Sequence, residues 1–107
     1  MCSGPDAGPS NVTATATNST EIYLTWGEIS KEYQNGVIEE YRILYTAGES
    51  FHGEEFVEPH KQDITLENLN IFTEYTISIS GRTVAGFGNG TTLVRRTLEE
   101  GMKLLHQ

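Results

Sequence analysis

Residues 75–81 alternate between apolar side chains and small hydroxyl side chains. The apolar set is Tyr75, Ile77 and Ile79, and the polar set is Thr76, Ser78 and Ser80. A repeat of two residues is the pattern of a β-strand that buries one face and exposes the other to water. This stretch therefore predicts a strand that packs one side against a hydrophobic core.

Tyr75 opens this strand just after a turn-like segment, residues 68–73, and Leu66 and Leu69 lie upstream of it. A tyrosine at this place can bury its ring while its hydroxyl bonds back to the backbone of the preceding turn. We expect that bond to fix the corner between two sheets.

Six further segments are predicted as strands. They are residues 11–16, 21–26, 38–47, a short edge strand within 48–59, 61–66 and 91–97. Trp26 alternates with Ile22 and Leu24 and is expected to anchor the core, because an indole ring buries a large apolar area. Strict alternation would turn Glu39 inward, so we expect a twist or bulge that returns Ile38 to the rim of the core.

Two loops between strands are predicted. Residues 27–36 are polar and end in Gln34-Asn35-Gly36, which supplies the positive-φ residues of a tight turn. Residues 84–90 are rich in glycine and are expected to form a loop that exposes Phe87 at its tip.

Seven short strands, without helical periodicity before residue 98, predict an all-β fold: a seven-stranded antiparallel immunoglobulin-like sandwich. From Gly8 to Glu100 the chain resembles the fibronectin type III family. The resemblance rests on Pro9, Ile22-x-Leu24-x-Trp26, Asn35-Gly36-x-Ile38-x-x-Tyr41-x-Ile43-x-Tyr45, Leu66-x-x-Leu69-x-x-x-x-x-Tyr75 and Thr83-x-x-Gly86-x-Gly88. It implies strands A-B-E in one sheet and C-C′-F-G in the other.

The chain departs from the family pattern in its loops. The prolines usual after the tryptophan are absent, and Ile71-Phe72 replaces the Pro-Gly that precedes the tyrosine corner. Family members that bind integrins do so through Arg-Gly-Asp in the loop that corresponds to residues 84–90. This loop lacks that motif, so integrin binding by that route is not expected.

A chain of 107 residues allows one domain with a modest core. Composition divides it into a linker at residues 1–8, a domain at 9–98, and a C-terminal linker or tail at 99–107. No apolar run is long enough for direct membrane insertion, and the N-terminus lacks the apolar stretch of a signal peptide. The sequence is therefore expected to be an excised piece or a cytosolic protein.

A formal net charge of −8 argues against nucleic acid as a partner, because its phosphates would be repelled. The single cysteine, Cys2, excludes an internal disulfide, so packing alone has to hold the core.

The residues do not predict an enzyme, a metal site or a cofactor. Catalysis needs convergent titratable groups in a cleft, whereas the adjacent glutamates at 39–40, 54–55 and 99–100 would point to opposite faces of a strand. His52 and His60 lie eight residues apart without the spacing of a zinc site, so both are expected to be solvated loop histidines.

Three sequons of the form Asn-x-Ser/Thr begin at Asn11, Asn18 and Asn89. Asn18 and Asn89 are predicted to lie on loops, where a sugar disturbs no packing, and Asn11 at the start of a strand. These sequons favour an extracellular setting, as part of a membrane-anchored or secreted parent protein.

Alternation places three arginines, Arg42, Arg82 and Arg96, outward from one sheet beside Leu44 and Val94. We expect either a basic, partly apolar stripe fit for an acidic protein or a sulfated glycan, or a solvated face on which Glu40 and nearby carboxylates pair with the arginines. Phe87 is the second candidate contact.

The sequence and the resemblance together indicate a non-catalytic extracellular protein-interaction and spacer module of a larger cell-adhesion or receptor protein. Its expected partners are another protein or neighbouring modules of the same chain. The alternatives are an intracellular scaffold module of the muscle type and an accessory module of a secreted enzyme.

Overall fold

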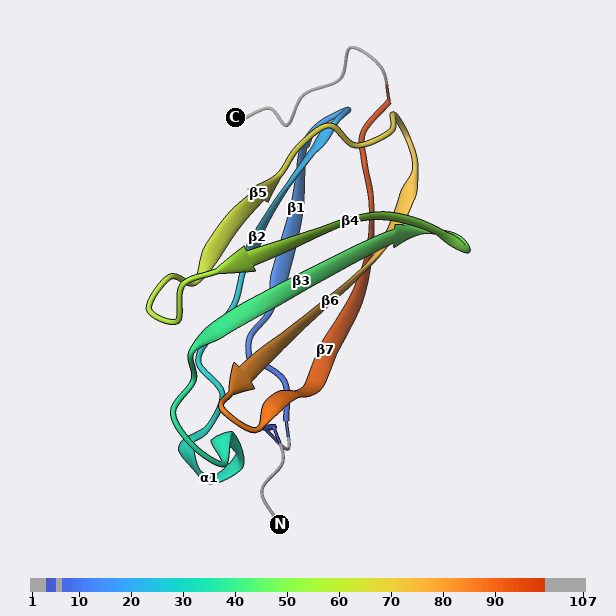
Figure 1. Cartoon of the computed structure of the whole chain (residues 1–107). Helices are drawn as coiled ribbons and strands as arrows, with labels where there is room; N and C mark the ends of the chain where they lie inside the picture. Colours follow the sequence, from blue (N-terminus) through green and yellow to red (C-terminus); the bar gives the residue numbers. More distant parts are fainter. Residues whose placement is uncertain (1–3, 6, 100–107) are drawn as a thin grey trace, which may run out of the picture.

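The structure is a computed structural model that describes residues 4, 5 and 7–99. Within them the chain forms seven strands and a single helical turn (Figure 1). These elements are β1 (Thr13–Asn18), β2 (Glu21–Thr25), α1 (Lys31–Gln34), β3 (Glu40–Ala47), β4 (Ser50–Val57), β5 (Asp63–Leu66), β6 (Glu74–Thr83) and β7 (Gly86–Arg96). The predicted all-β class and strand number are confirmed.

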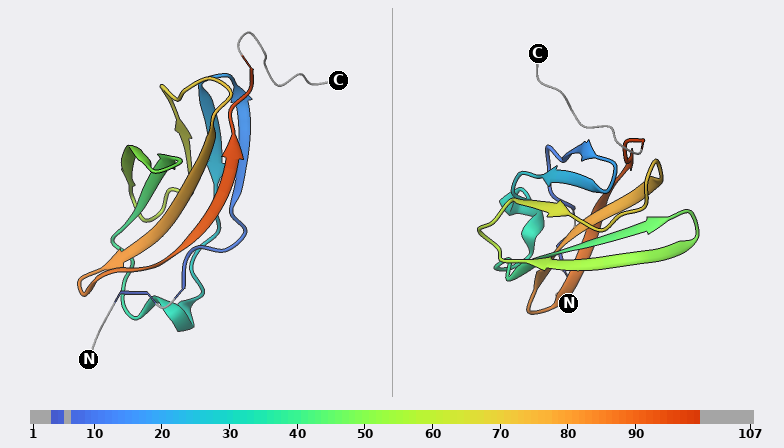
Figure 2. Two further views of the ribbon diagram at one scale, coloured as in Figure 1. Left: turned by 90° about the vertical axis from the view of Figure 1, so that its right-hand side faces the viewer. Right: turned by 90° about the horizontal axis from the view of Figure 1, so that it is seen from above.

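The strands form two antiparallel sheets that pack face to face. One sheet has the order β1-β2-β5 and the other β4-β3-β6-β7, and Figure 2 shows them as separate layers. This is the A-B-E and C′-C-F-G division implied by the family resemblance, so the predicted sandwich is confirmed. None of the helices in the described ranges has the length and apolar character needed to cross a bilayer.

The core lies where the inward faces of the two sheets meet. Trp26 from one layer is 4% exposed, and its ring lies edge-on to Tyr41 of the other layer, with 5.7 Å between ring centroids. Ile77 and Ile79 are fully buried beside them. Such aromatic pairs contribute about 0.5–1.5 kcal/mol beyond the area they bury. The predicted core anchor is confirmed.

The tyrosine corner is present as predicted. Tyr75 is fully buried, and its hydroxyl oxygen accepts the backbone N–H of Asn70 at 2.7 Å. Leu66 and Leu69 are both buried below the turn. The bond ties residue 70 to the start of β6, so the connection from β5 crosses between the sheets in one fixed path.

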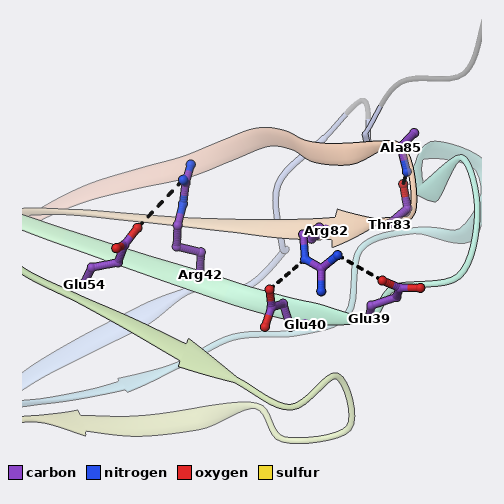
Figure 3. Close-up of polar contacts among 7 residues, drawn as sticks. All are labelled: Glu39, Glu40, Arg42, Glu54, Arg82, Thr83 and Ala85. Atoms are coloured by element: carbon purple, nitrogen blue, oxygen red, sulfur yellow. Dashed lines mark hydrogen bonds and ion pairs between the residues drawn. The ribbon is translucent and has the colours of Figure 1, made fainter.

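The loop predicted over residues 84–90 is wrong. β6 runs to Thr83 and β7 starts at Gly86, so the connecting turn contains only Val84 and Ala85. The Thr83 hydroxyl accepts the Ala85 N–H at 3.2 Å inside that turn (Figure 3), and Gly86 takes φ +120. Glycines at alternate positions hide the apolar period of a strand, but the backbone still pairs with β6. Phe87 therefore lies in a strand and is half-buried, not exposed at a loop tip.

Two other segments differ from expectation. The loop at 27–36 contains α1 and buries Ile29, which is 1% exposed, and the edge strand β4 spans eight residues rather than a short stretch. Before β3 the chain behaves as expected: Ile38 packs against the core and Glu39 is exposed. Both misses arise because a lone apolar residue in a polar loop, or a strand interrupted by a glycine and two adjacent glutamates, leaves no period in the sequence.

Replacing Tyr75 with phenylalanine is expected to lower the free energy of unfolding by about 1–2 kcal/mol, because the Asn70 N–H loses its acceptor. Urea unfolding measures the change. Tyr23→Phe is the matched control: its hydroxyl donates to Asp63 at 2.9 Å on a ring that is 38% exposed, and its effect should stay within about 0.5 kcal/mol. Equal effects of the two variants would contradict the corner's role.

Candidate protein-binding face

The three predicted arginines all lie on the outer face of the four-stranded sheet. Arg42 is in β3, Arg82 in β6 and Arg96 in β7. The structure brings the first two together, whereas Arg96 pairs in register with Glu74 at the other end of β6. That end is eight residues from Arg82, or about 26 Å along an extended strand.

Each of these arginines pairs with carboxylates on the same face. Arg82 donates from Nε to Glu40 at 2.7 Å and from Nη1 to Glu39 at 3.0 Å (Figure 3). The hydrogen bond to Glu40 raises the pKa of the Arg82 guanidinium above its ordinary value. Arg42 Nη1 lies 3.8 Å from Glu54 Oε2, and Arg96 Nη2 lies 3.8 Å from Glu74 Oε2. Three guanidinium groups thus face four carboxylates, which is the paired arrangement and not a net basic stripe.

Aromatic rings complete this face. The Arg42 guanidinium carbon lies 4.1 Å from the centroid of the Phe87 ring, and that of Arg82 lies 5.9 Å from it. Phe56 of β4, which is 53% exposed, lies with its ring centroid 6.4 Å from that of Phe87. Sequence reasoning missed Phe56 as a site residue, because only the register of β3 and β4 sets it opposite Arg42.

We call Arg42, Phe56, Arg82 and Phe87 the Phe–Arg cluster. It combines exposed aromatic surface with guanidinium groups that are already held in place by Glu39, Glu40 and Glu54. Aromatic and arginine side chains are enriched in protein–protein interfaces and at their energetic centres. The face is chemically suited to bind another protein surface.

The three sequon asparagines occupy different settings. Asn18 is the last residue of β1, where its side chain accepts the Thr20 N–H at 2.8 Å and donates to Glu21 at 3.1 Å. Asn11 is exposed ahead of β1 with φ +50, rather than at the start of a strand. Asn89, predicted on a loop, is an exposed residue of β7.

A cleft of about 290 Å³ opens at the side of the sandwich between β4 and the chain around β5. It is lined by Tyr45, His52, Glu55, Thr65, Glu67 and Asn68. His52, expected to be a solvated loop histidine, lies in β4, with Nδ1 3.3 Å from the Tyr75 hydroxyl and Nε2 3.1 Å from the Asn68 carbonyl oxygen. The histidine thereby links the Tyr75 hydroxyl in β6 to β4, the edge strand of the same sheet, and to the chain that follows β5.

Within residues 4–5 and 7–99, no three His, Cys, Asp or Glu side chains come close enough to hold a metal ion. The described histidines therefore stand apart from any such cluster. His60 pairs with Glu58 at 3.3 Å on the surface. Cys2 lies outside the described residues.

Fold and face define a β-sandwich module with an aromatic and arginine-containing sheet face. Residues 7–96 match the family profile described as "Fibronectin type III domain", and the chain belongs to this family.

Among curated proteins, the chain is 32% identical over 108 residues to mouse "Protein sidekick-1" and 32% identical over 100 residues to chicken "Cell adhesion molecule DSCAM". Each match covers 90% of this chain and 5% of the relative, so the chain spans a small part of the length of these proteins. It is homologous to modules of cell-adhesion proteins.

Solved structures agree with the fold. The third fibronectin III domain of human KIAA0343 superposes with a TM-score of 0.81 at 22% identity, covering 99% of this chain and 93% of that one. The chicken CNTN1 FN1-FN3 structure gives a TM-score of 0.74 at 26% identity, covering 89% of this chain and 31% of that one.

Titration of Tyr45 is expected to report the side cleft. Burial, together with a hydrogen bond that Tyr45 donates to Glu55 at 3.1 Å, raises the pKa of Tyr45 from 10.0 to about 12. The folded state thus holds this proton more tightly than the unfolded chain does. The resulting stabilisation is fully present below pH 10 and is lost as the pH rises through 12.

Tyrosine ring NMR across alkaline pH measures this pKa. Glu55→Gln is expected to lower the pKa of Tyr45 while leaving it above the ordinary value, because burial, the largest cause, remains. A Tyr45 resonance that titrates near pH 10 in the native chain would contradict the assignment.

Proposed function

We propose that this chain is a non-catalytic, extracellular protein-interaction and spacer module of a larger cell-adhesion or receptor protein. The observation that carries the proposal is the identity of 32% to sidekick-1 and DSCAM across 90% of the chain, combined with coverage of only 5% of either relative. A single sandwich within a long protein can bind partners through its surface and connect to neighbouring modules at its two ends.

The spacer role is supported by the layout of the sandwich. The described N-terminal residues lie beside the turn between β6 and β7, whereas the chain leaves β7 at the opposite end of the sandwich (Figure 1). After β7, the Leu98 N–H donates to the carbonyl oxygen of Asn18, the last residue of β1, at 3.3 Å. Strands run the length between the two ends. A chain that enters at one end and leaves at the other sets the distance between its neighbours.

The interaction role centres on the Phe–Arg cluster. A protein partner accounts for this face better than a sulfated glycan does. Every arginine of the face is neutralised by glutamates, and the whole chain carries a net charge of −8, which repels a polyanion. The exposed ring of Phe56 and the flanking ion pairs instead match the aromatic centre and polar rim of protein interfaces.

Alanine replacement of Arg42 and Arg82 together is expected to weaken protein binding by at least about tenfold, the usual loss when an interface centre is truncated. Binding of the immobilised chain to recombinant sidekick-1 and DSCAM ectodomains, and to a second copy of itself, measures the change. Arg95→Ala is the matched control: Arg95 is exposed on β7 and has no ion pair among the described residues. Thermal unfolding confirms that each variant is folded.

A heparin column separates the two partner classes. The native chain is expected to elute without retention at physiological salt, and alanine at Arg42, Arg82 and Arg96 together should change nothing. Heparin retention that disappears in this triple variant would favour a sulfated glycan over a protein partner.

The extracellular setting is tested by mass spectrometry of the chain secreted from animal cells. We expect a glycan on Asn11 and Asn89, which are exposed. Asn18 can carry a glycan only if the one hydrogen left on its side-chain nitrogen keeps the bond to Glu21. Three unoccupied sequons would instead favour the intracellular scaffold module of the muscle type. The accessory module of a secreted enzyme is distinguished by the sequence of the parent protein.

A further inference from the structure

The ladder between β6 and β7 is irregular near its turn. Ser80 pairs with Gly90 and Arg82 pairs with Phe87, so Gly81 alone faces Gly88 and Asn89. Two residues opposite one make a β-bulge, which bends the strand and releases backbone groups from the ladder. Here the bulge lies on β7, the edge strand of the sheet, opposite the buried Gly81. We define the bulge notch by Gly81, Gly88 and Asn89.

Gly4 and Pro5 fill this notch. Pro5 is fully buried, and its carbonyl oxygen accepts the backbone N–H of Asn89 at 3.0 Å. The Gly4 carbonyl oxygen accepts a hydrogen bond from the side-chain amide of Asn35 at 3.1 Å. Further along, the Thr91 hydroxyl donates to the Pro9 carbonyl at 2.7 Å. Composition alone assigns residues 1–8 to a linker; within that stretch, Gly4 and Pro5 are buried against β7.

The close contact between the leader and β7 requires glycine at two positions, Gly88 in β7 and Gly4 in the leader. A Cβ atom on Gly88 would overlap the backbone of Pro5, and a Cβ atom on Gly4 would overlap the backbone of Phe87 and Gly88. The φ of Gly88 lies outside the left-handed region, so close approach of the leader, and not backbone strain, requires a glycine there. The Pro5 ring reaches the core side of the sheet: a Cβ atom added to Gly81 would lie 3.7 Å from Pro5 Cγ and would also meet the Ile29 side chain.

Proline suits this position for two reasons. Its ring fixes φ, so little conformational entropy is lost on docking, and it has no N–H that would need a partner once buried. Glycine before it allows the close backbone approach. We propose that the bulge notch is a binding site for an extended Gly-Pro segment, occupied here by Gly4-Pro5 of the same chain. Docking then fixes the direction from which the polypeptide enters the domain, which a flexible linker would leave free.

The proposal does not depend on the Phe–Arg cluster or on any partner, and it is tested on the full chain. Gly4→Ala and Gly88→Ala are expected to expel the leader and to speed hydrogen exchange of the Asn89 amide by about tenfold or more, as befits loss of its hydrogen bond. Gly4 lies outside the sandwich strands, so Gly4→Ala reports on docking even if Gly88→Ala impairs folding. Thr92→Ala, at an exposed position of β7, is the control and should leave Asn89 protected.

A second background separates docking from strand stability. In a Pro5→Asp chain, where the leader is already displaced, Gly88→Ala should add little further exchange at Asn89. A synthetic peptide with the sequence of residues 3–10 should restore Asn89 protection in the Pro5→Asp chain, whereas the same peptide with alanine for proline at position 5 should not. Unchanged Asn89 exchange in Gly4→Ala, equal effects of Gly88→Ala in both backgrounds, or no protection by the native peptide at millimolar concentration would each overturn the proposal.

Discussion

The burial of Trp26 against Tyr41 is the contact on which the rest of the structure depends. It joins the two sheets without a disulfide, and Ile77 and Ile79 close around it. The bond from Asn70 to the Tyr75 hydroxyl then holds the crossover from β5 to β6, so the inward faces of the sheets stay opposite each other. With the layers fixed in this way, outward residues of β3, β4, β6 and β7 form one continuous face, and the loops are distributed between two ends.

On that face, pairing with glutamates decides what the arginines can bind. From the sequence alone, the three outward arginines allow either a basic stripe or a face on which Glu40 and nearby carboxylates pair with them. In the folded sheet, Arg82 bonds Glu39 and Glu40, while Arg42 lies near Glu54 and over the Phe87 ring. The ion pairs neutralise the arginines and hold them in place, which favours contact with a mixed protein surface over attraction of a polyanion. The same pairing leaves the aromatic rings as the chemically distinct feature of the face.

Strands that bury one face were predictable, because burial of one face places apolar residues at every second position of the sequence. The period at Tyr75–Gly81 and the Trp26 strand placed the core correctly, and the tyrosine corner followed from Tyr75 and the turn before it. The strand character of residues 86–90 was not predictable, since glycines carry no side chain to show a period. Phe56 and His52 were missed for a related reason. Phe56 contacts Phe87 and His52 contacts Tyr75, and each partner lies in another strand. The sequence of a single segment does not reveal its register with another strand.

The sequence by itself determined the class of fold, the succession of strands along the chain and most residues of the core, because hydrophobic burial acts on local periodicity. Tertiary structure alone decided which charges pair, how Phe87 is covered, and that Gly4 and Pro5 pack against β7. Those outcomes depend on contacts between residues distant in the chain, such as Asn89 with Pro5 and Arg82 with Glu40. Such contacts exist only after two sheets have set the distances between strands.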